Sequence, residues 1–154
     1  MKIYYCDEWS DIKKKPWNIF DEPTAYLHHK KNQPYTAVLT EDEKPKYIVN
    51  VTKDWVSVSF FDELTRKYLN FDFEVMGRGK LFLRTAIYWD YDDETDKEVS
   101  SLILGFREDG CIAMEKRDLK TGSVEEREAS NTLEKNWDLF PEFGQYLHLC
   151  KEER

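Results

Sequence analysis

The densest cluster of charged residues in the chain consists of six carboxylates within one short stretch. They are Asp90, Asp92, Asp93, Glu94, Asp96 and Glu98. A calcium loop needs oxygen ligands at fixed spacing and a glycine at its sharp turn, and this stretch contains no glycine. The simplest interpretation is a solvated loop at a hairpin tip. A third interpretation, after the calcium loop and the solvated loop, is a contact surface for a basic partner. Opposite electrostatic potentials on two proteins speed their association.

Aromatic residues accompany this acidic stretch. Tyr88 and Trp89 precede it and Tyr91 lies within it. Exposed aromatics of this kind are typical hot spots of protein interfaces. The predicted partner-binding residues are therefore Tyr88, Trp89, Asp90, Tyr91, Asp92, Asp93, Glu94, Asp96 and Glu98.

Other carboxylates give an enzyme hypothesis as the alternative. If a hairpin forms around residues 77–79, Asp72 and Glu74 would face Asp90 or Asp92 across neighbouring strands. Two carboxylates with separated pKa values are an acid and base device, which suggests a small hydrolase or lyase. The sequence contains no HExxH pattern, nucleophile elbow or glycine-rich phosphate loop. We therefore predict that the chain is not an enzyme.

Residues that bind metals are few and scattered. The histidines are His28, His29 and His148, and the cysteines are Cys6, Cys111 and Cys150. The odd number of cysteines and the absence of a CxxC spacing fit neither a disulfide framework nor a zinc site. We predict no metal or cofactor, and a reducing compartment.

The composition limits the class of partner. Among 154 residues, 23 Lys and Arg oppose 31 Asp and Glu, which gives a formal charge of −8. This net charge repels nucleic acid and anionic lipid and favours basic partners. Trp55, Trp89 and Trp137 could stack on bases, but aromatic core packing is the favoured interpretation. With no apolar leader or membrane-length stretch, we expect a cytoplasmic protein that binds no membrane, with a monomer favoured.

Short alternating runs predict the elements that position these residues. The runs are residues 35–40, 47–52, 55–60, 68–76, 80–91, 99–107, 111–116 and 124–130. Turn residues separate them, as in an antiparallel meander. Gly77 and Gly79 supply the positive φ angles of the clearest hairpin. The fold class is therefore mainly β, with α+β as the alternative: one domain, residues 1–154, with a curved sheet over 35–130.

The two ends of the chain have weaker patterns. Residues 1–34 are interrupted by prolines and lysines, and we expect an irregular segment with a strand or short helical pieces that covers the sheet. Residues 131–154 are expected to dock on the sheet. Pro141 can start a short helix that places Phe143, Tyr146, Leu147 and Cys150 near one face.

The C-terminal half resembles the bacterial immunity protein 27 family. The resemblance lies in LFLRTAIYWDYDDETD (81–96), a strand reaching Phe106 with the turn EDG (108–110), MEKRDLKTGSVEEREAS (114–130) and NWDLFPEFGQYLHLCKEER (136–154). In the last block, Trp137, Pro141, Phe143, Gly144 and Tyr146 match a W-x-x-x-P-x-F-G-x-Y ending. The first 70 or so residues carry no comparable match.

This resemblance implies an immunity protein of a contact-dependent inhibition or polymorphic toxin system. Such a protein binds the C-terminal domain of its cognate toxin in the bacterial cytoplasm and neutralises it. A basic nuclease is one candidate toxin, because carboxylates can replace the phosphates of its substrate. An acidic interaction module unrelated to toxins is the remaining alternative.

Overall fold

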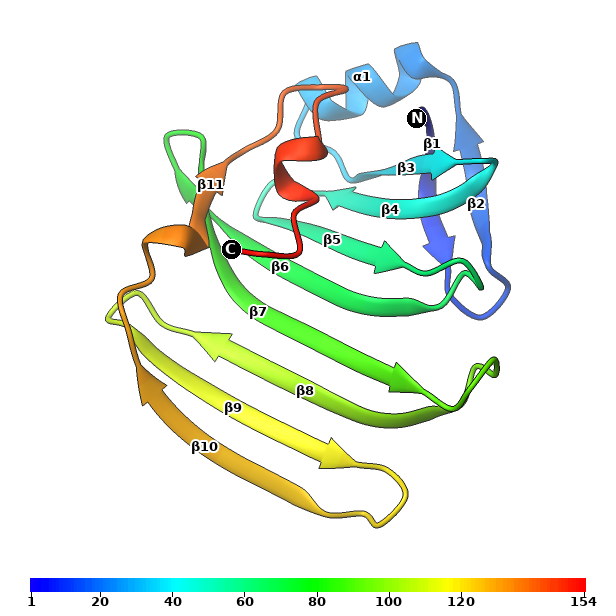
Figure 1. Cartoon of the computed structure of the whole chain (residues 1–154). Coiled ribbons are helices and arrows are strands. Elements are labelled where there is room, and N and C mark those ends of the chain that lie inside the picture. The colour runs from blue at the N-terminus through cyan, green and yellow to red at the C-terminus, as the bar shows by residue number, and fades with distance from the viewer.

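The order of strands along the chain is almost the order of strands in the sheet. The computed structural model describes residues 1–154 as one 11-stranded antiparallel sheet, in the order β10-β9-β8-β7-β6-β5-β4-β3-β1-β2, with β11 paired to β7 (Figure 1). The strands are β1 (Lys2–Ser10), β2 (Lys15–Phe20), β3 (Tyr35–Glu41), β4 (Lys44–Val51), β5 (Trp55–Phe61), β6 (Lys67–Gly77), β7 (Lys80–Tyr91), β8 (Glu98–Phe106), β9 (Cys111–Asp118), β10 (Val124–Ser130) and β11 (Trp137–Leu139). The predicted mainly β, antiparallel meander is confirmed.

Alternation along the strands builds the core on one face of this sheet. Val49, Val58 and Phe71 lie opposite one another on β4, β5 and β6, and all three are buried. They belong to a cluster of 19 buried residues, and we call the face that carries it the core face. Their neighbours Asn50 and Ser57 point to the other side, which we call the opposite face.

The hairpin between β6 and β7 forms where its glycines predicted it. Gly77, Arg78 and Gly79 have φ angles of 92°, 55° and 72°, all in the left-handed region. Glycine adopts this region without steric cost, so two of the three turn positions are unstrained. The turn pairs Gly77 with Lys80, so β7 begins at its predicted first residue, and two irregularities in the β6–β7 pairing then shift the register along the pair.

The N-terminal segment is regular, so the prediction of an irregular cover over residues 1–34 was wrong in detail. Strands β1 and β2 extend the sheet beyond β3, and helix α1 (Glu22–Lys30) follows them. The Asp21 carboxylate caps this helix by accepting a 2.8 Å hydrogen bond from the Thr24 amide. Ala25 of α1 is buried in the main core.

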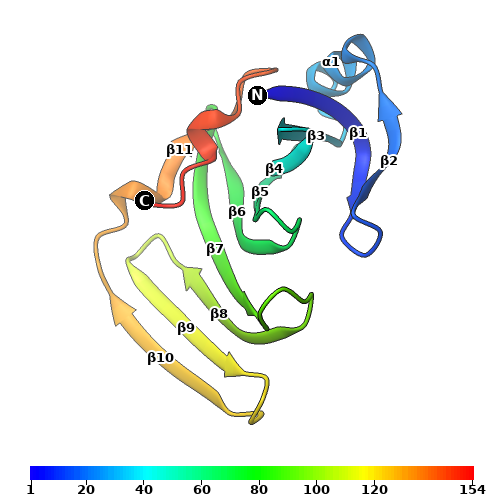
Figure 2. The same cartoon turned by 45° about the vertical axis from the view of Figure 1, so that its right-hand side comes forward.

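The far end of the β1–β2 hairpin nevertheless covers part of the opposite face. The pairing of β1 with β3 stops at Cys6, and the hairpin continues toward the β5–β6 turn and the β7–β8 loop (Figure 2). There, Lys14 Nζ lies 3.2 Å from the Leu64 carbonyl oxygen and 3.0 Å from Asp96 Oδ1. Two loops that are distant in sequence are therefore joined by the hairpin tip.

The C-terminal segment docks on the core face, as predicted. Tyr146 and Leu149 are buried in the main core, and the hydroxyls of Tyr146 and Tyr35 lie 3.0 Å apart. The helix expected from Pro141 is absent. Gly144 has a φ of 82°, which interrupts any helix there, and only short 3-10 turns form at Glu134–Asn136 and Leu147–Leu149. Leu147 is consequently 59% exposed.

Strands β8, β9 and β10 extend beyond the part of the sheet that the C-terminal segment covers (Figure 1). Strand β10 forms one edge of the sheet, and all its residues are exposed. Its charged residues suit an edge that must resist pairing with other chains.

No helix in the structure is long and apolar enough to cross a lipid bilayer.

Candidate interaction surface at the β7–β8 loop

The predicted acidic stretch forms the connection between β7 and β8, and we call residues 92–97 the acidic loop. The loop is closed by its own backbone. The Lys97 carbonyl accepts a 2.8 Å hydrogen bond from the Asp92 amide, and the Asp92 carbonyl accepts a 2.9 Å bond from the Thr95 amide. Asp93 has a φ of 46°, a conformation that Asp tolerates better than most residues. The expected hairpin tip is confirmed.

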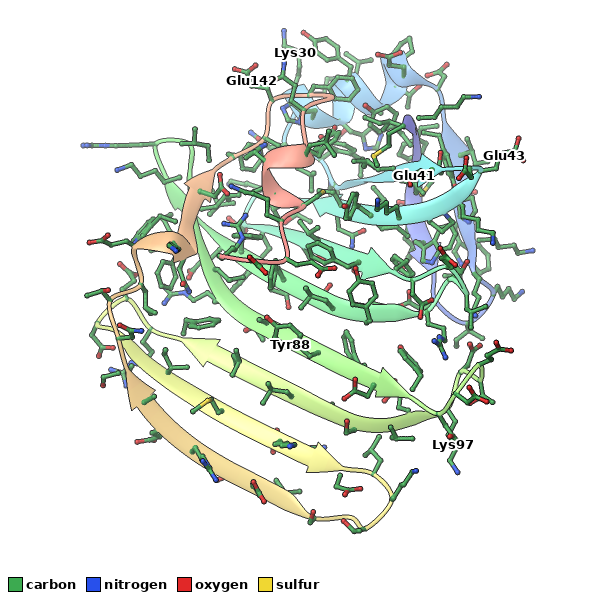
Figure 3. The ribbon with its side chains drawn as sticks, in the orientation of Figure 1. Lys30, Glu41, Glu43, Tyr88, Lys97 and Glu142 are labelled. Atoms are coloured by element: carbon green, nitrogen blue, oxygen red, sulfur yellow. The ribbon has the colours of Figure 1, made fainter.

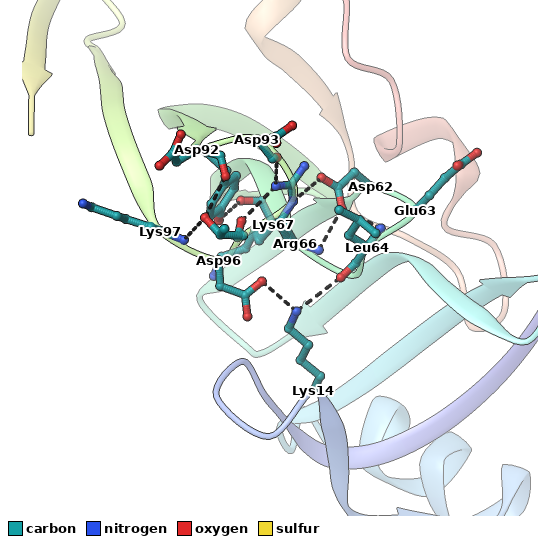
Figure 4. Close-up of polar contacts among 12 residues, drawn as sticks. Lys14, Asp62, Glu63, Leu64, Arg66, Lys67, Asp92, Asp93, Asp96 and Lys97 are labelled. Carbon is teal, nitrogen blue, oxygen red and sulfur yellow. Dashed lines mark hydrogen bonds and ion pairs between the residues drawn. The ribbon is translucent and has the colours of Figure 1, made fainter. Parts of the chain in front are cut away.

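Arg66, on the neighbouring β5–β6 connection, holds the acidic loop by its backbone. Its Nη1 donates to the carbonyl oxygens of Asp93 and Thr95 at 2.7 and 2.9 Å (Figure 4). Its Nε donates to Asp62 Oδ2 at 2.9 Å, and its guanidinium lies 5.0 Å from the Tyr91 ring centre. Because Arg66 binds backbone carbonyl oxygens, it orders the acidic loop without forming ion pairs with the carboxylates of the loop.

Most of the acidic side chains therefore remain unpaired. Asp90 accepts a 2.8 Å hydrogen bond from Ser100 Oγ, and Asp96 forms the ion pair with Lys14. Four other carboxylates of the stretch are exposed and make no ion pair or side-chain hydrogen bond: Asp92, Asp93, Glu94 and Glu98. The acidic loop presents this charge to solvent from an ordered backbone.

The expectation that the neighbouring aromatics are exposed was wrong. Tyr88 lies on the core face, opposite Leu69 of β6, and Figure 3 shows it over the middle of β7, away from Lys97 of the acidic loop. Burial raises the pKa of Tyr88. Trp89 points to the opposite face, where Lys67 Nζ lies 5.3 Å from its ring centre. Strand alternation therefore separates two residues that are adjacent in sequence.

Tyr91 is also half-buried. Its hydroxyl donates a 2.5 Å hydrogen bond to the Lys67 carbonyl oxygen, and Arg66 covers its ring. Burial raises the pKa of Tyr91 to about 12. Trp89 and Tyr91 therefore pack against Lys67 and Arg66 next to the acidic loop. The exposed contact area comes from the carboxylates.

Three cations of this surface were not found from the sequence. Lys14, Arg66 and Lys67 come from three separate connections or strands, and each forms an ion pair with an acid: Asp96, Asp62 and Asp11 respectively. Together with Trp89 and Tyr91 they line a hollow of about 490 Å³ beneath the hairpin tip. The run of three lysines at 13–15 was the one available sequence signal.

The residues of the enzyme hypothesis are not brought together. Asp72 lies opposite Thr85 on β7, and Asp90 lies opposite Ser100 on β8. Glu74 instead accepts a 2.5 Å hydrogen bond from Arg84 Nε. Burial raises the pKa of Asp72, but no second carboxylate faces it across β7. The structure also contains no group of three His, Cys, Asp or Glu residues that could hold a metal ion.

A second hollow lies on the core face, between the C-terminal segment and strands β6, β7 and β8. Its volume is about 1160 Å³, and its floor includes Phe71, Ala86, Tyr88, Leu104 and Phe106. One wall is formed by residues 131–138, and the other by residues 151–154. Sequence reasoning did not predict this groove, because its walls come from residues whose pattern lacks a regular period.

Three comparisons with known proteins identify no related protein. A scan against protein-family models, a search of curated proteins and a search of solved structures each find no match to this chain. The function is therefore inferred from the residues and geometry of the chain itself.

Proposed function

We propose that this chain is an immunity protein that binds and neutralises a basic toxin domain through its acidic loop. The observation that carries the proposal is the ordered acidic loop, with three unpaired, exposed carboxylates and the exposed Glu98 directly after it at the start of β8. A fixed array of like charges attracts a basic surface over a distance of about a Debye length, roughly 8–10 Å in physiological salt. Because the loop backbone is already held by Arg66, little ordering cost is added when a partner binds.

One contact within the chain supports the choice of a basic partner. The Lys14 ammonium lies between the Asp96 carboxylate and the Leu64 carbonyl, at 3.0 and 3.2 Å. This pair of acceptors fits an ammonium group. A partner that presents lysines or arginines would find further free carboxylates at Asp92, Asp93 and Glu94.

Two whole-chain properties support the proposed setting. The formal charge of −8 favours basic proteins over nucleic acid. Cys6, Cys111 and Cys150 are all free thiols, which is compatible with a reducing cytoplasm. A nuclease domain is a suitable toxin, since the carboxylates can occupy the positions of its substrate phosphates.

The proposal is tested by binding to the C-terminal domain of the protein encoded immediately upstream. The variant Asp92→Asn, Asp93→Asn, Glu94→Gln removes three carboxylates but keeps their size and all the backbone contacts of Arg66. Association at low salt is expected to be about tenfold slower or more, with a weaker dependence on salt, because steering by opposite charge is lost. Stopped-flow measurements across a salt series give both quantities.

A matched control separates local charge from net charge. Asp42→Asn, Glu43→Gln, Glu142→Gln also changes the formal charge from −8 to −5, at three exposed carboxylates without ion pairs. Figure 3 shows Glu43 and Glu142 away from Lys97 of the acidic loop. The control should associate at a rate near that of the unmodified protein. Equal slowing by both variants would show that the acidic loop is not the binding surface.

A further inference from the structure

A row of polar side chains crosses the opposite face of the sheet, on strands β4, β5 and β6. Ser59 on β5 and Asn70 on β6 lie directly opposite one another, and they are only 6% and 9% exposed. Asn50 and Ser57 form the next pair, on β4 and β5. Burying amides and hydroxyls has a free-energy cost unless they are hydrogen-bonded, so their position requires an explanation.

The end of the β1–β2 hairpin covers this row and encloses a hollow that we call the hairpin pocket. Its volume is about 290 Å³. The sheet contributes Asn50, Ser57, Ser59, Asn70 and Phe61, and Lys67 also lines the hollow; the hairpin contributes Glu8, Trp9 and Asp11. At ~30 Å³ for each water molecule, this space equals about ten waters, near the lower limit for small-molecule sites.

The polar side chains of the hairpin pocket retain unused hydrogen-bonding capacity. Asn50 Oδ1 accepts from Thr36 Oγ1 at 2.7 Å, and Asn50 Nδ2 donates to Ser57 Oγ at 3.3 Å. Asn70 Oδ1 accepts from Ser59 Oγ at 2.8 Å, and Asn70 Nδ2 donates to Asp72 at 3.1 Å. Each amide nitrogen carries two hydrogens, and only one of them is used in these contacts. The network is thus fixed in orientation and still able to donate.

Trp9 adds a donor that has no partner at all. Its indole Nε1 is buried and makes no hydrogen bond within the protein. Native proteins leave few such groups unpaired. The Trp9 ring packs edge-on against Phe61, with ring centres 6.2 Å apart, so the indole is held in place at the wall of the hairpin pocket.

The charges around the hairpin pocket select the class of ligand. Glu8 and Asp11 are acids, and the one cation, Lys67, is paired with Asp11 at 3.0 Å. Asp72 adds a further acid beside Asn70. An anionic ligand would meet this excess of carboxylates, whereas hydroxyl groups can donate to the carboxylates and accept from the free N–H groups.

We propose that the hairpin pocket binds one small, neutral polyhydroxylated molecule of the size of a monosaccharide. The hairpin acts as its lid. The contacts of Lys14 and Lys67 that hold the lid are exposed ion pairs and one hydrogen bond to a carbonyl, and contacts of this kind are weak. The tip of the lid can therefore lift without disturbing the core face, while Trp9 stays packed against Phe61.

The test uses the whole chain and four free sugars: glucose, galactose, mannose and N-acetylglucosamine. Each is titrated at millimolar concentrations by isothermal calorimetry, with inorganic phosphate and glycine as charged probes. At least one sugar is expected to bind with a stoichiometry of one, and the charged probes are not. Absence of binding by all four sugars, or tighter binding of phosphate, would overturn the proposal.

A single substitution tests the position of the site. Trp9→Phe keeps an aromatic ring against Phe61 but removes the unpartnered N–H. Sugar binding should weaken about fivefold to tenfold, because the smaller ring withdraws apolar contact from the wall of the hairpin pocket. The melting temperature should not fall through loss of a hydrogen bond, because the indole N–H makes none within the protein.

Trp17→Phe is the matched control. Trp17 lies on β2, is 49% exposed and does not line the hairpin pocket. Sugar affinity should be unchanged in this variant. If Trp9→Phe binds sugar as tightly as the unmodified protein, or if both variants weaken binding equally, the hairpin pocket is not the site.

Discussion

At the scale of single residues, His29 links the N-terminal helix to the core through one polar contact. Its Nδ1 lies 2.7 Å from the Tyr35 hydroxyl, which in turn contacts the Tyr146 hydroxyl. Burial lowers the pKa of His29 and raises the pKa values of both tyrosines. Of these three hydrogen-bonded side chains, His29 is therefore the one whose protonation can change near neutral pH.

This shift predicts a loss of stability in weak acid. The unfolded chain binds a proton at its ordinary histidine pKa of ~6.5, before the folded protein does. As the pH falls below this value, the free energy of unfolding decreases. In His29→Gln, the melting temperature should fall less between pH 7.5 and 5.5 than in the unmodified protein. His28→Gln is the control, and an identical pH profile in all three proteins would contradict this role of His29.

At the scale of elements, Arg66 is predicted to order the acidic loop. Arg66→Met removes the bonds to the Asp93 and Thr95 carbonyls and the ion pair with Asp62, but keeps an unbranched side chain near Tyr91. Losing about 1.4 kcal/mol of local stability would speed amide hydrogen exchange of residues 92–97 by roughly tenfold. Arg107→Met is the control, because Arg107 is 72% exposed and pairs only with Asp109. Unchanged loop exchange in Arg66→Met would show that another contact orders the loop.

The C-terminal segment is predicted to stabilise the sheet by burying a few side chains. Leu149 is fully buried in the main core, whereas Leu147, two residues earlier, is 59% exposed. Leu149→Ala should lower the free energy of unfolding by about 2–5 kcal/mol, the usual cost of a buried leucine. Leu147→Ala should change it by about 0.5 kcal/mol or less. Urea unfolding of both variants measures the difference, and similar values would contradict the docking described here.

Prediction from sequence succeeded where alternation was bounded by clear turns. Strands β7 and β10 have the predicted bounds, because Gly77 and Gly79 set the start of one and Gly122 precedes the other. It failed in the first 34 residues. There, Pro16 and Asn18, which has a φ of 51°, interrupt the alternation of a strand that pairs with β1 on either side of Asn18.

The candidate site was predicted in part for a similar reason. The acidic residues of the loop are contiguous, so their clustering is visible in the sequence. Arg66 binds backbone carbonyls 27 and 29 residues away, and such acceptors leave no mark on residue type. The burial of Tyr88 and Tyr91 depends on the register of β7 with its neighbours, which composition does not fix.

At the scale of the whole molecule, the sheet separates three surfaces by position. On the core face, α1 and the C-terminal segment cover the part built from β1 and β3–β7, whereas β8–β10 extend beyond this cover (Figures 1 and 2). The hairpin pocket lies on the opposite face, and the acidic loop lies at the ends of β7 and β8. The loop can therefore contact a large partner without rearrangement of the core. The Lys14–Asp96 ion pair joins the lid of the hairpin pocket to the acidic loop, and the three-carboxylate loop variant keeps this contact because it leaves Asp96 unchanged.

The central claim is neutralisation of a toxin, and co-expression tests it most directly. The C-terminal domain of the upstream gene product is expressed in bacteria alone, with this protein, and with the three-carboxylate loop variant. We predict that growth is lost with the domain alone, is restored by the unmodified protein and is restored less well by the loop variant. Growth arrest that persists in the presence of the unmodified protein, with no complex recovered by pull-down, would contradict the claim.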